Sequence, residues 1–209
     1  MPPIALTFSG DTLYIFWKYT QAFGFHKRSK HKSPHKPPQK KPESFGIPIV
    51  VPKKFNSLNN QKKFILATIH RAENVDNKIR LKKILNTINK LAENNLVFFP
   101  VHPRTRKKIK SLKSNLSSNI IIKNPISYSE TIYLLSKSIF CFTDSGGLQE
   151  ESVILKKRCI IPSNKTPHNF YLHKFANHLV QLEKQNYMSD VEKFTRSILT
   201  NKIKSFSHK

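Results

Sequence analysis

The sequence predicts an α/β protein built on a single parallel sheet with helices on both faces, and two observations point to this fold class. From about residue 60, six short apolar runs rich in β-branched and aromatic residues recur along the chain, as in strands buried on both faces. Segments with the apolar spacing of amphipathic helices separate these runs. Because strands that alternate with helices form a parallel sheet, we expect a Rossmann-like domain.

The individual elements follow from local patterns. The expected strands are residues 64–69, 96–101, 120–122, 139–142, 159–161 and 178–182. A helix is expected over residues 78–94, where apolar side chains repeat every three or four positions. Ser127 and Glu130 form the capping-box pattern of a helix start and predict a helix to about residue 138. Ser189 and Glu192 repeat the pattern and predict a last helix to about residue 201.

Two zones precede this domain, which we assign to residues 59–209. Residues 1–25 are aromatic and contain one acidic residue, Asp11. Residues 26–58 form a basic linker rich in proline, histidine and lysine. Like charges repel and prolines forbid regular hydrogen bonding, so we expect an extended, solvated segment. The linker could also bind nucleic acid or anionic lipid, and its histidines could hold a metal ion loosely, but a plain charged linker is the simpler interpretation.

The charge balance favours polyanionic partners. The chain has 37 Lys and Arg against 12 Asp and Glu, a formal net charge of +25. This composition excludes an acidic solvating protein and favours nucleotide phosphates, nucleic acid or an anionic membrane surface as partners. No apolar run approaches the ~20 residues that a membrane span requires, and no signal peptide is evident, so we expect a cytoplasmic protein that does not cross the membrane.

Cysteine and glycine usage narrows the chemistry. Cys141 and Cys159 lie in apolar runs and are expected to be reduced, buried thiols. No spacing typical of a zinc site occurs, and the five glycines do not form a Walker loop or a GxGxxG fingerprint. We therefore expect no metal and no cofactor.

Polar clusters follow three of the predicted strands. His70 and Arg71 follow the first strand, and His102 and Arg104 follow the second. Residues 143–151, TDSGGLQEE, follow the fourth. Ligands of open parallel sheets bind beyond the carboxyl ends of the strands, so we expect the three clusters to lie at one edge.

The third cluster has the pattern of a phosphate site. Ser145, Gly146 and Gly147 precede a helix, and their backbone N–H groups, with the positive end of the helix dipole, suit a diphosphate. Glu151, four residues further on, could accept hydrogen bonds from ribose hydroxyls. The alternative is a tight strand-to-helix turn whose acidic residues only satisfy the dipole. We expect Asp144 to brace the loop rather than to perform chemistry.

The other two clusters allow two interpretations each. His70 could act as an acid or base, or with Arg71 neutralise a phosphate. Alternatively it is a structural histidine bonded to backbone. His102 and Arg104 are equally consistent with facing a phosphate and with a structural role.

Together these segments resemble the non-hydrolysing UDP-N-acetylglucosamine 2-epimerases. The resemblance rests on residues 67–74 (ATIHRAEN), residues 99–105 (FPVHPRT), Pro125 with Tyr128, and the string 143–151, with matching order and spacing. It implies the carboxy-terminal domain of a glycosyltransferase-B-like fold, in which two Rossmann-like domains hold a UDP-sugar between them. It also implies interconversion of UDP-GlcNAc and UDP-ManNAc, by elimination of UDP and re-addition at C2, without a cofactor.

The resemblance assigns roles to single residues. It implies that His70 is the catalytic histidine of this half. It further implies that Ser145, Gly146 and Gly147 contact the diphosphate and that Glu151 holds the nucleotide. Arg71, His102 and Arg104 are then the remaining candidates for substrate binding.

The departures from the family are equally informative. The family's amino-terminal domain is missing, apart from residues 1–25, which resemble its interdomain crossover. Ile126 replaces a family glutamine, Thr131 an aromatic residue, and residues 165–169 the family string Thr-Glu-Arg-Pro-Glu. Removing a C2 proton and UDP demands an acid and a base on both faces of the sugar, and the missing half carries the acidic groups.

We therefore expect a truncated or divergent family member of cell-surface polysaccharide biosynthesis. A separately encoded amino-terminal half, or a homodimer partner, would complete it. The alternative is a non-catalytic remnant that binds UDP or UDP-sugars. A basic nucleic-acid binder using residues 26–54 is the least favoured function, because the segment lacks the interleaved aromatic residues of a stacking surface.

Overall fold

The computed structural model of the protein describes residues 5–7, 46–48, 63–166 and 177–200. The chain divides into two compact units, residues 1–53 and 54–209. In the first unit, β1 (Ala5–Thr7) pairs antiparallel with β2 (Gly46–Pro48). The sequence patterns did not predict this pair. The remainder of the two amino-terminal zones, including residues 26–45 of the basic linker, lies outside the described residues.

The second unit is an α/β domain with a six-stranded parallel sheet, and the predicted fold class is confirmed. Its strands are β3 (Phe64–Thr68), β4 (Leu96–Pro100), β5 (Ile120–Lys123), β6 (Phe140–Thr143), β7 (Arg158–Pro162) and β8 (His178–Val180). Its helices are α3 (Ala72–Val75), α4 (Lys78–Ala92), α5 (Pro103–Ser111), α6 (Tyr128–Lys137), α7 (Gly146–Ile154) and α9 (Tyr187–Leu199). Each predicted strand is present, with ends that differ by no more than a few residues.

The order of the strands places a topological switch point in the middle of the sheet. The order is β5-β4-β3-β6-β7-β8, so the chain moves outward from β3 in one direction and then returns to start again at β6. Thr68 and Thr143, at the carboxyl ends of β3 and β6, are register partners, and their hydroxyl oxygens lie 2.5 Å apart. Ligand sites of doubly wound sheets lie at such a point.

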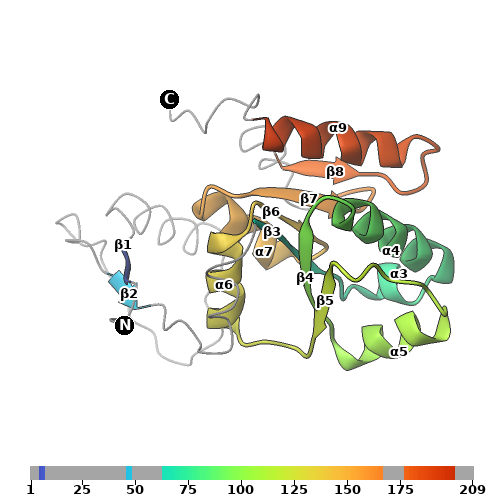
Figure 1. Ribbon diagram of the computed structural model, residues 1–209, viewed down its shortest axis with the longest axis horizontal. Coiled ribbons are helices and arrows are strands. Elements are labelled where there is room, and N and C mark those ends of the chain that lie inside the picture. The colour runs from blue at the N-terminus through green and yellow to red at the C-terminus, as the bar shows by residue number, and fades with distance from the viewer. Residues whose placement is uncertain (1–4, 8–45, 49–62, 167–176, 201–209) are drawn as a thin grey trace, which may run out of the picture. The chain divides into compact units, whose positions relative to one another are not determined.

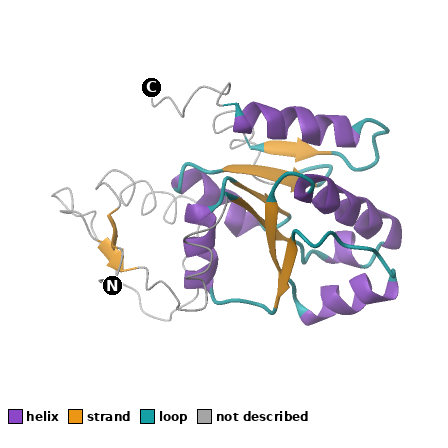
Figure 2. Ribbon diagram, in the orientation of Figure 1, coloured by secondary structure: helices purple, strands orange, loops and turns teal. Residues whose placement is uncertain are grey.

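Helices cover both faces of the sheet (Figures 1 and 2). Helices α4, α5 and α9 share one core cluster with alternate strand residues such as Ile65, Phe99 and Phe142. Helices α6 and α7 cover the opposite face, where Leu134 and Leu148 are buried. Since neither face meets water, strand residues of both faces are apolar, and this explains the unbroken apolar runs.

The two cysteines belong to this buried sheet. Cys141 on β6 and Cys159 on β7 are register partners, and both are buried and unlinked. Their predicted burial is confirmed. Burial, together with the neighbouring Cys141, raises the pKa of the Cys159 thiol well above its ordinary value.

One predicted helix start is confirmed and one is wrong. The Ser127 hydroxyl accepts from the Glu130 N–H at 3.3 Å, and the Glu130 carboxylate accepts from the Ser127 N–H at 2.8 Å, which is a complete capping box. The last helix begins at Tyr187 rather than after Ser189, and its N-cap makes no side-chain hydrogen bond. Tyr187 packs against the core, so the apolar stripe of α9 extends one turn further than the local polar pattern indicated.

Candidate functional site

The switch point brings two of the predicted clusters into direct contact. The loop after β3 carries His70 and Arg71, and the loop after β6 carries Asp144. The fully buried Asp144 carboxylate accepts hydrogen bonds from the backbone N–H groups of His70, at 3.1 Å, and Arg71, at 3.0 Å. It also accepts from the Asn74 side-chain amide at 3.0 Å, and it lies 3.2 Å from Nδ1 of His70. Asp144 therefore braces the loop, as the sequence indicated.

The same contacts set the protonation of the pair. Hydrogen bonding to Asp144 raises the pKa of His70 above its ordinary value, against the opposing effects of partial burial and of the Arg71 charge. Burial acts to raise the pKa of Asp144, but hydrogen bonds from His70, Asn74 and Arg71 outweigh it and lower that pKa. Asp144 thus stays a carboxylate, and His70 is biased toward the imidazolium form.

The glycine loop opens α7 next to this pair. Ser145 is the N-cap of α7, and its hydroxyl accepts from the Leu148 N–H at 3.4 Å. The first helical backbone hydrogen bond runs from the Gln149 N–H to the Ser145 carbonyl. Gly146 and Gly147 lie before the first residue whose N–H donates within the helix. Gly147 is exposed, and a Cβ placed there would meet nothing within 4 Å. The protein's own packing does not require a glycine at this position, which leaves space for an external group to approach.

Glu151 lies in the second turn of α7, beside Tyr128 at the start of α6. Burial raises the pKa of Glu151, Tyr128 acts to lower it, and the Glu150 charge raises it further. Burial and the Glu151 carboxylate raise the pKa of Tyr128. The tyrosine side chain is 65% exposed, so this polar pair opens to solvent at one end.

The other predicted residues have partners within the protein. His102 caps α5, and its Nδ1 accepts from the Arg104 N–H at 3.3 Å. The Arg104 guanidinium pairs with Asp76. Arg71 lies 4.0 Å from Glu73 and is about one third exposed. His102 and Arg104 follow β4, one strand away from the switch point, and both remain exposed.

Sequence reasoning missed two residues behind His70. Asn74 is fully buried, and its carbonyl oxygen accepts from Nε and Nη2 of Arg80 at 3.2 and 3.1 Å. Arg80 also pairs with Glu183 in the loop before α9. Asn74 is the last residue of the string ATIHRAEN. A polar amide within the short helix α3 was the one local signal that this side chain has a buried partner.

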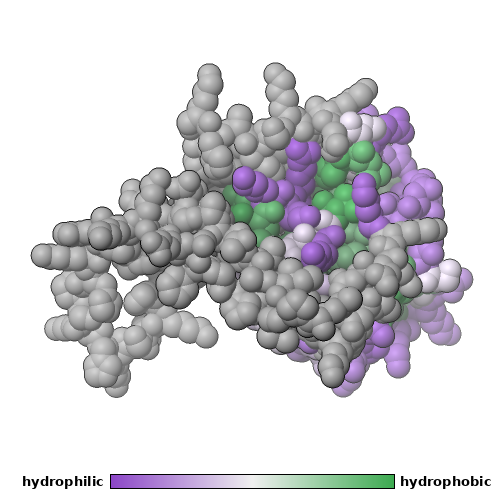
Figure 3. Space-filling model, turned by 60° about the vertical axis from the view of Figure 1, so that its left-hand side comes forward, coloured by the Kyte–Doolittle hydropathy of each residue, from purple (hydrophilic) through white to green (hydrophobic). Residues whose placement is uncertain are grey.

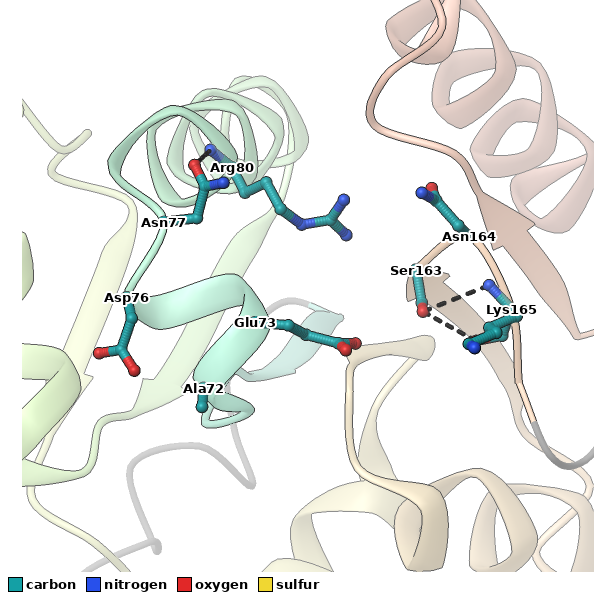
Figure 4. Close-up of a pocket in the computed structure, with 8 residues that line it drawn as sticks. All are labelled: Ala72, Glu73, Asp76, Asn77, Arg80, Ser163, Asn164 and Lys165. Carbon is teal, nitrogen blue, oxygen red and sulfur yellow. Dashed lines mark hydrogen bonds between the residues drawn. The ribbon is translucent and has the colours of Figure 1, made fainter.

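A shallow pocket of about 580 Å³ opens beside these residues (Figure 4). Arg80 reaches toward the segment after β7 that carries Ser163, Asn164 and Lys165, and Glu73 points into the space between them. Lys165 is also the first of residues 165–169, where the sequence departs from the family that it resembles. Among the described residues, no cluster of histidine, cysteine and carboxylate side chains could hold a metal ion.

Fold and site together define the class: a doubly wound α/β domain whose polar side chains and glycine loop meet at the switch point of the sheet. The family model for UDP-N-acetylglucosamine 2-epimerase matches residues 49–209. The chain belongs to this family. Within the part of the chain that is described, every helix is too short or too polar to cross a membrane.

Individual relatives support the assignment. A UDP-N-acetylglucosamine 2-epimerase from Methanocaldococcus jannaschii is 38% identical over 162 residues, which are 74% of this chain and 42% of that protein. The Pseudomonas aeruginosa UDP-2,3-diacetamido-2,3-dideoxy-D-glucuronate 2-epimerase is 42% identical over 110 residues, 52% of this chain and 30% of that protein. The crystal structure of the M. jannaschii enzyme with UDP-GlcNAc and UDP matches with a TM-score of 0.63 and 33% identity, covering 75% of this chain and 45% of that one. The chain therefore spans less than half the length of these relatives.

Proposed function

We propose that this chain is the nucleotide-binding half of a UDP-sugar 2-epimerase and that it binds UDP and UDP-GlcNAc at the switch point. The observation that carries the proposal is the contact of the His70 loop with the loop that opens α7. The structure of the M. jannaschii relative contains UDP-GlcNAc and UDP, which supports the choice of ligand.

The geometry suits a diphosphate at the start of α7. Gly146 and Gly147 offer backbone N–H groups at the positive end of the helix dipole, without side chains that keep a ligand away. The pKa of His70 is raised by its hydrogen bond to Asp144, and the ring supplies a positive charge beside this loop whenever it is protonated. Glu151 lies far enough along α7 to accept hydrogen bonds from the ribose hydroxyls.

The chemistry at the sugar needs a second half. Epimerisation at C2 by loss and re-addition of UDP requires acid and base groups on both faces of the ring. The described domain supplies one wall of such a site. The other wall would come from outside the described domain, for example from a separate polypeptide or from a second copy. Alone, these residues bind the nucleotide-sugar without catalysing its epimerisation. A non-catalytic remnant would behave in the same way.

Proton NMR of UDP-GlcNAc with the purified chain in D₂O tests the proposal. We expect saturation transfer to uracil and ribose and no deuterium at C2 of the sugar. Deuterium at C2 with growth of UDP-ManNAc would show that this chain is sufficient for catalysis. The absence of saturation transfer with both UDP and UDP-GlcNAc would refute the nucleotide site.

Two variants assign the signal to residues. Glu151→Ala and His70→Ala should each weaken UDP binding, whereas Glu192→Ala, on the exposed face of α9, should leave it unchanged. Unchanged binding in both site variants would contradict the residue assignment. Addition of a separately encoded amino-terminal half to the wild-type chain should produce the deuterium exchange that we do not expect from this chain alone.

The proposed setting is the cytoplasm, where a protein with two buried, unlinked cysteines is expected to work.

On the face drawn in Figure 3, hydrophobic areas of the described residues lie among hydrophilic ones. Ile79 and Tyr128 are the most exposed large hydrophobic residues of the described part of the chain, at 72% and 65%, and a second half could cover such surface.

A further inference from the structure

Within the part of the chain that the structure describes, His70 is held at one ring nitrogen, Nδ1. Its Nδ1 lies 3.2 Å from Oδ1 of Asp144, whose side chain is 0% exposed, while the His70 side chain is 54% exposed. Because the two ring nitrogens lie on different sides of the imidazole, the contact at Nδ1 leaves Nε2 as the nitrogen available to a ligand.

Asp144 cannot turn away from this contact. Its Oδ2 accepts from the Arg71 N–H at 3.0 Å and from the Asn74 amide at 3.0 Å. The Asn74 amide is itself fixed, because its carbonyl oxygen faces Nε and Nη2 of Arg80, and a guanidinium only donates. The amide nitrogen must therefore face Asp144. Oδ1 accepts from the His70 backbone N–H at 3.1 Å and keeps a second lone pair for the imidazole nitrogen at 3.2 Å.

We propose that Asp144 is a positioning residue that holds the proton of neutral His70 on Nδ1 and so presents a bare Nε2 to the ligand. A carboxylate only accepts hydrogen bonds, so it selects the ring form with a proton on Nδ1. The orientation matters because histidine in a catalytic pair loses its function when the partner favours the wrong tautomer. The identity of the ligand rests on the proposed function, but the assignment of the Nδ1–H tautomer to His70 does not.

The assignment defines what Nε2 can do in each protonation state. In the imidazolium form, Nε2–H donates to a phosphate oxygen while Nδ1–H stays on Asp144. In the neutral form, Nε2 can accept a proton from the ligand. The charged groups that face His70 are Asp144, from the loop before α7, and Arg71, its neighbour in its own loop. Binding of a phosphate therefore favours uptake of a proton, and affinity falls as the pH rises through the His70 pKa.

The first test needs no ligand and no variant of Asp144. Long-range nitrogen–proton NMR of the complete chain, above the His70 titration, distinguishes the two neutral tautomers by their ring-nitrogen shifts. The chain has nine histidines, and His70→Gln identifies the signal by its loss. We expect the Nδ1–H form. The Nε2–H form would overturn the proposal, whether or not UDP binds.

A second test changes the partner. In Asp144→Asn the new amide can donate to Nδ1 while its oxygen keeps the contacts with the N–H groups. We expect the tautomer to invert to Nε2–H and the His70 pKa to fall, because the negative charge is lost. Asp190→Asn is the matched control: Asp190 faces His178 instead, so the His178 titration moves and that of His70 does not.

The two tests cover each failure. Should Asp144→Asn not fold, the wild-type tautomer alone decides. A folded Asp144→Asn with an unchanged His70 titration and tautomer would show that Asp144 only braces the loop. Because neither readout involves a nucleotide, a chain that fails to bind UDP would refute the proposed function and leave this inference to stand or fall separately.

Discussion

Gly147 separates the requirements of folding from those of binding. A Cβ at this position would meet nothing within 4 Å, so Gly147→Ala introduces no clash within the protein. Gly147 is the second residue of α7, and alanine is favoured over glycine by up to about 1 kcal/mol in a helix. Near a helix end the stabilisation from replacing glycine with alanine is smaller. We therefore expect the unfolding temperature to stay constant or to rise by up to about 4 °C.

Binding should respond in the opposite direction. A phosphate oxygen that accepts from a backbone N–H lies about 2.9 Å from the nitrogen, whereas a carbon contact needs about 3.5 Å or more. The added methyl group displaces the diphosphate from the start of α7. Losing one hydrogen bond to a charged group costs about 1.5–3 kcal/mol, which lowers the affinity for UDP roughly 10- to 150-fold.

The assay is calorimetric titration with UDP and thermal unfolding of the same preparations. Ser189→Ala, in the first turn of α9 at the far edge of the sheet, is the matched control and should leave UDP affinity unchanged. Wild-type affinity in Gly147→Ala would refute the close approach of the diphosphate to this backbone. A loss of several degrees in unfolding temperature would refute the claim that the fold does not need the glycine.

Three further outcomes are expected. UDP affinity should fall as the pH drops through the Glu151 pKa, which burial raises. The reason is that only the carboxylate form accepts hydrogen bonds from both ribose hydroxyls. Glu151→Gln should abolish this pH dependence in calorimetric titrations. Ser127→Ala removes one half of the capping box and should lower the free energy of unfolding by about 1 kcal/mol, measured by urea denaturation, with UDP affinity retained. Leu85→Ala, at a side chain that is 1% exposed on α4, should lower it by about 2–5 kcal/mol, and a loss below about 1 kcal/mol would contradict the assigned core.

Acid should also lower the free energy of unfolding through protonation of Asp144. Its pKa is lower in the folded protein than in the unfolded chain, so the unfolded state takes up the proton first as the pH falls. The stabilisation from Asp144 is therefore complete above the unfolded pKa and is lost progressively below it. His70 has the opposite sign: its raised pKa stabilises the fold at low pH, and this contribution disappears as the pH rises through the folded value.

Local patterns predicted much of the domain because each depends on neighbouring residues. The run before His70 is apolar because β3 is buried on both faces, and the same reason applies to β6. The capping box at Ser127 needs only a residue three positions away. The convergence of the His70 and Ser145 loops followed from topology, since carboxyl ends of parallel strands share an edge.

Other features had no local signal. The start of α9 was missed because a polar cap pattern competed with the packing of Tyr187 on a core that the chain reaches only after folding. The pair β1 and β2 joins segments about forty residues apart and carries no marked alternation. The Asn74 amide is oriented by Arg80, six positions along the chain on another helix.

Residue type, period and order were enough to predict the class of fold, the family and the edge of the sheet at which the polar residues gather. Which atoms meet at that edge depends on the folded chain. Asp144 and His70 are 74 positions apart, and their contact exists because β3 and β6 are paired in one particular register. A shift of one residue in this register would move Asp144 about 3.3 Å relative to His70 and break the contact.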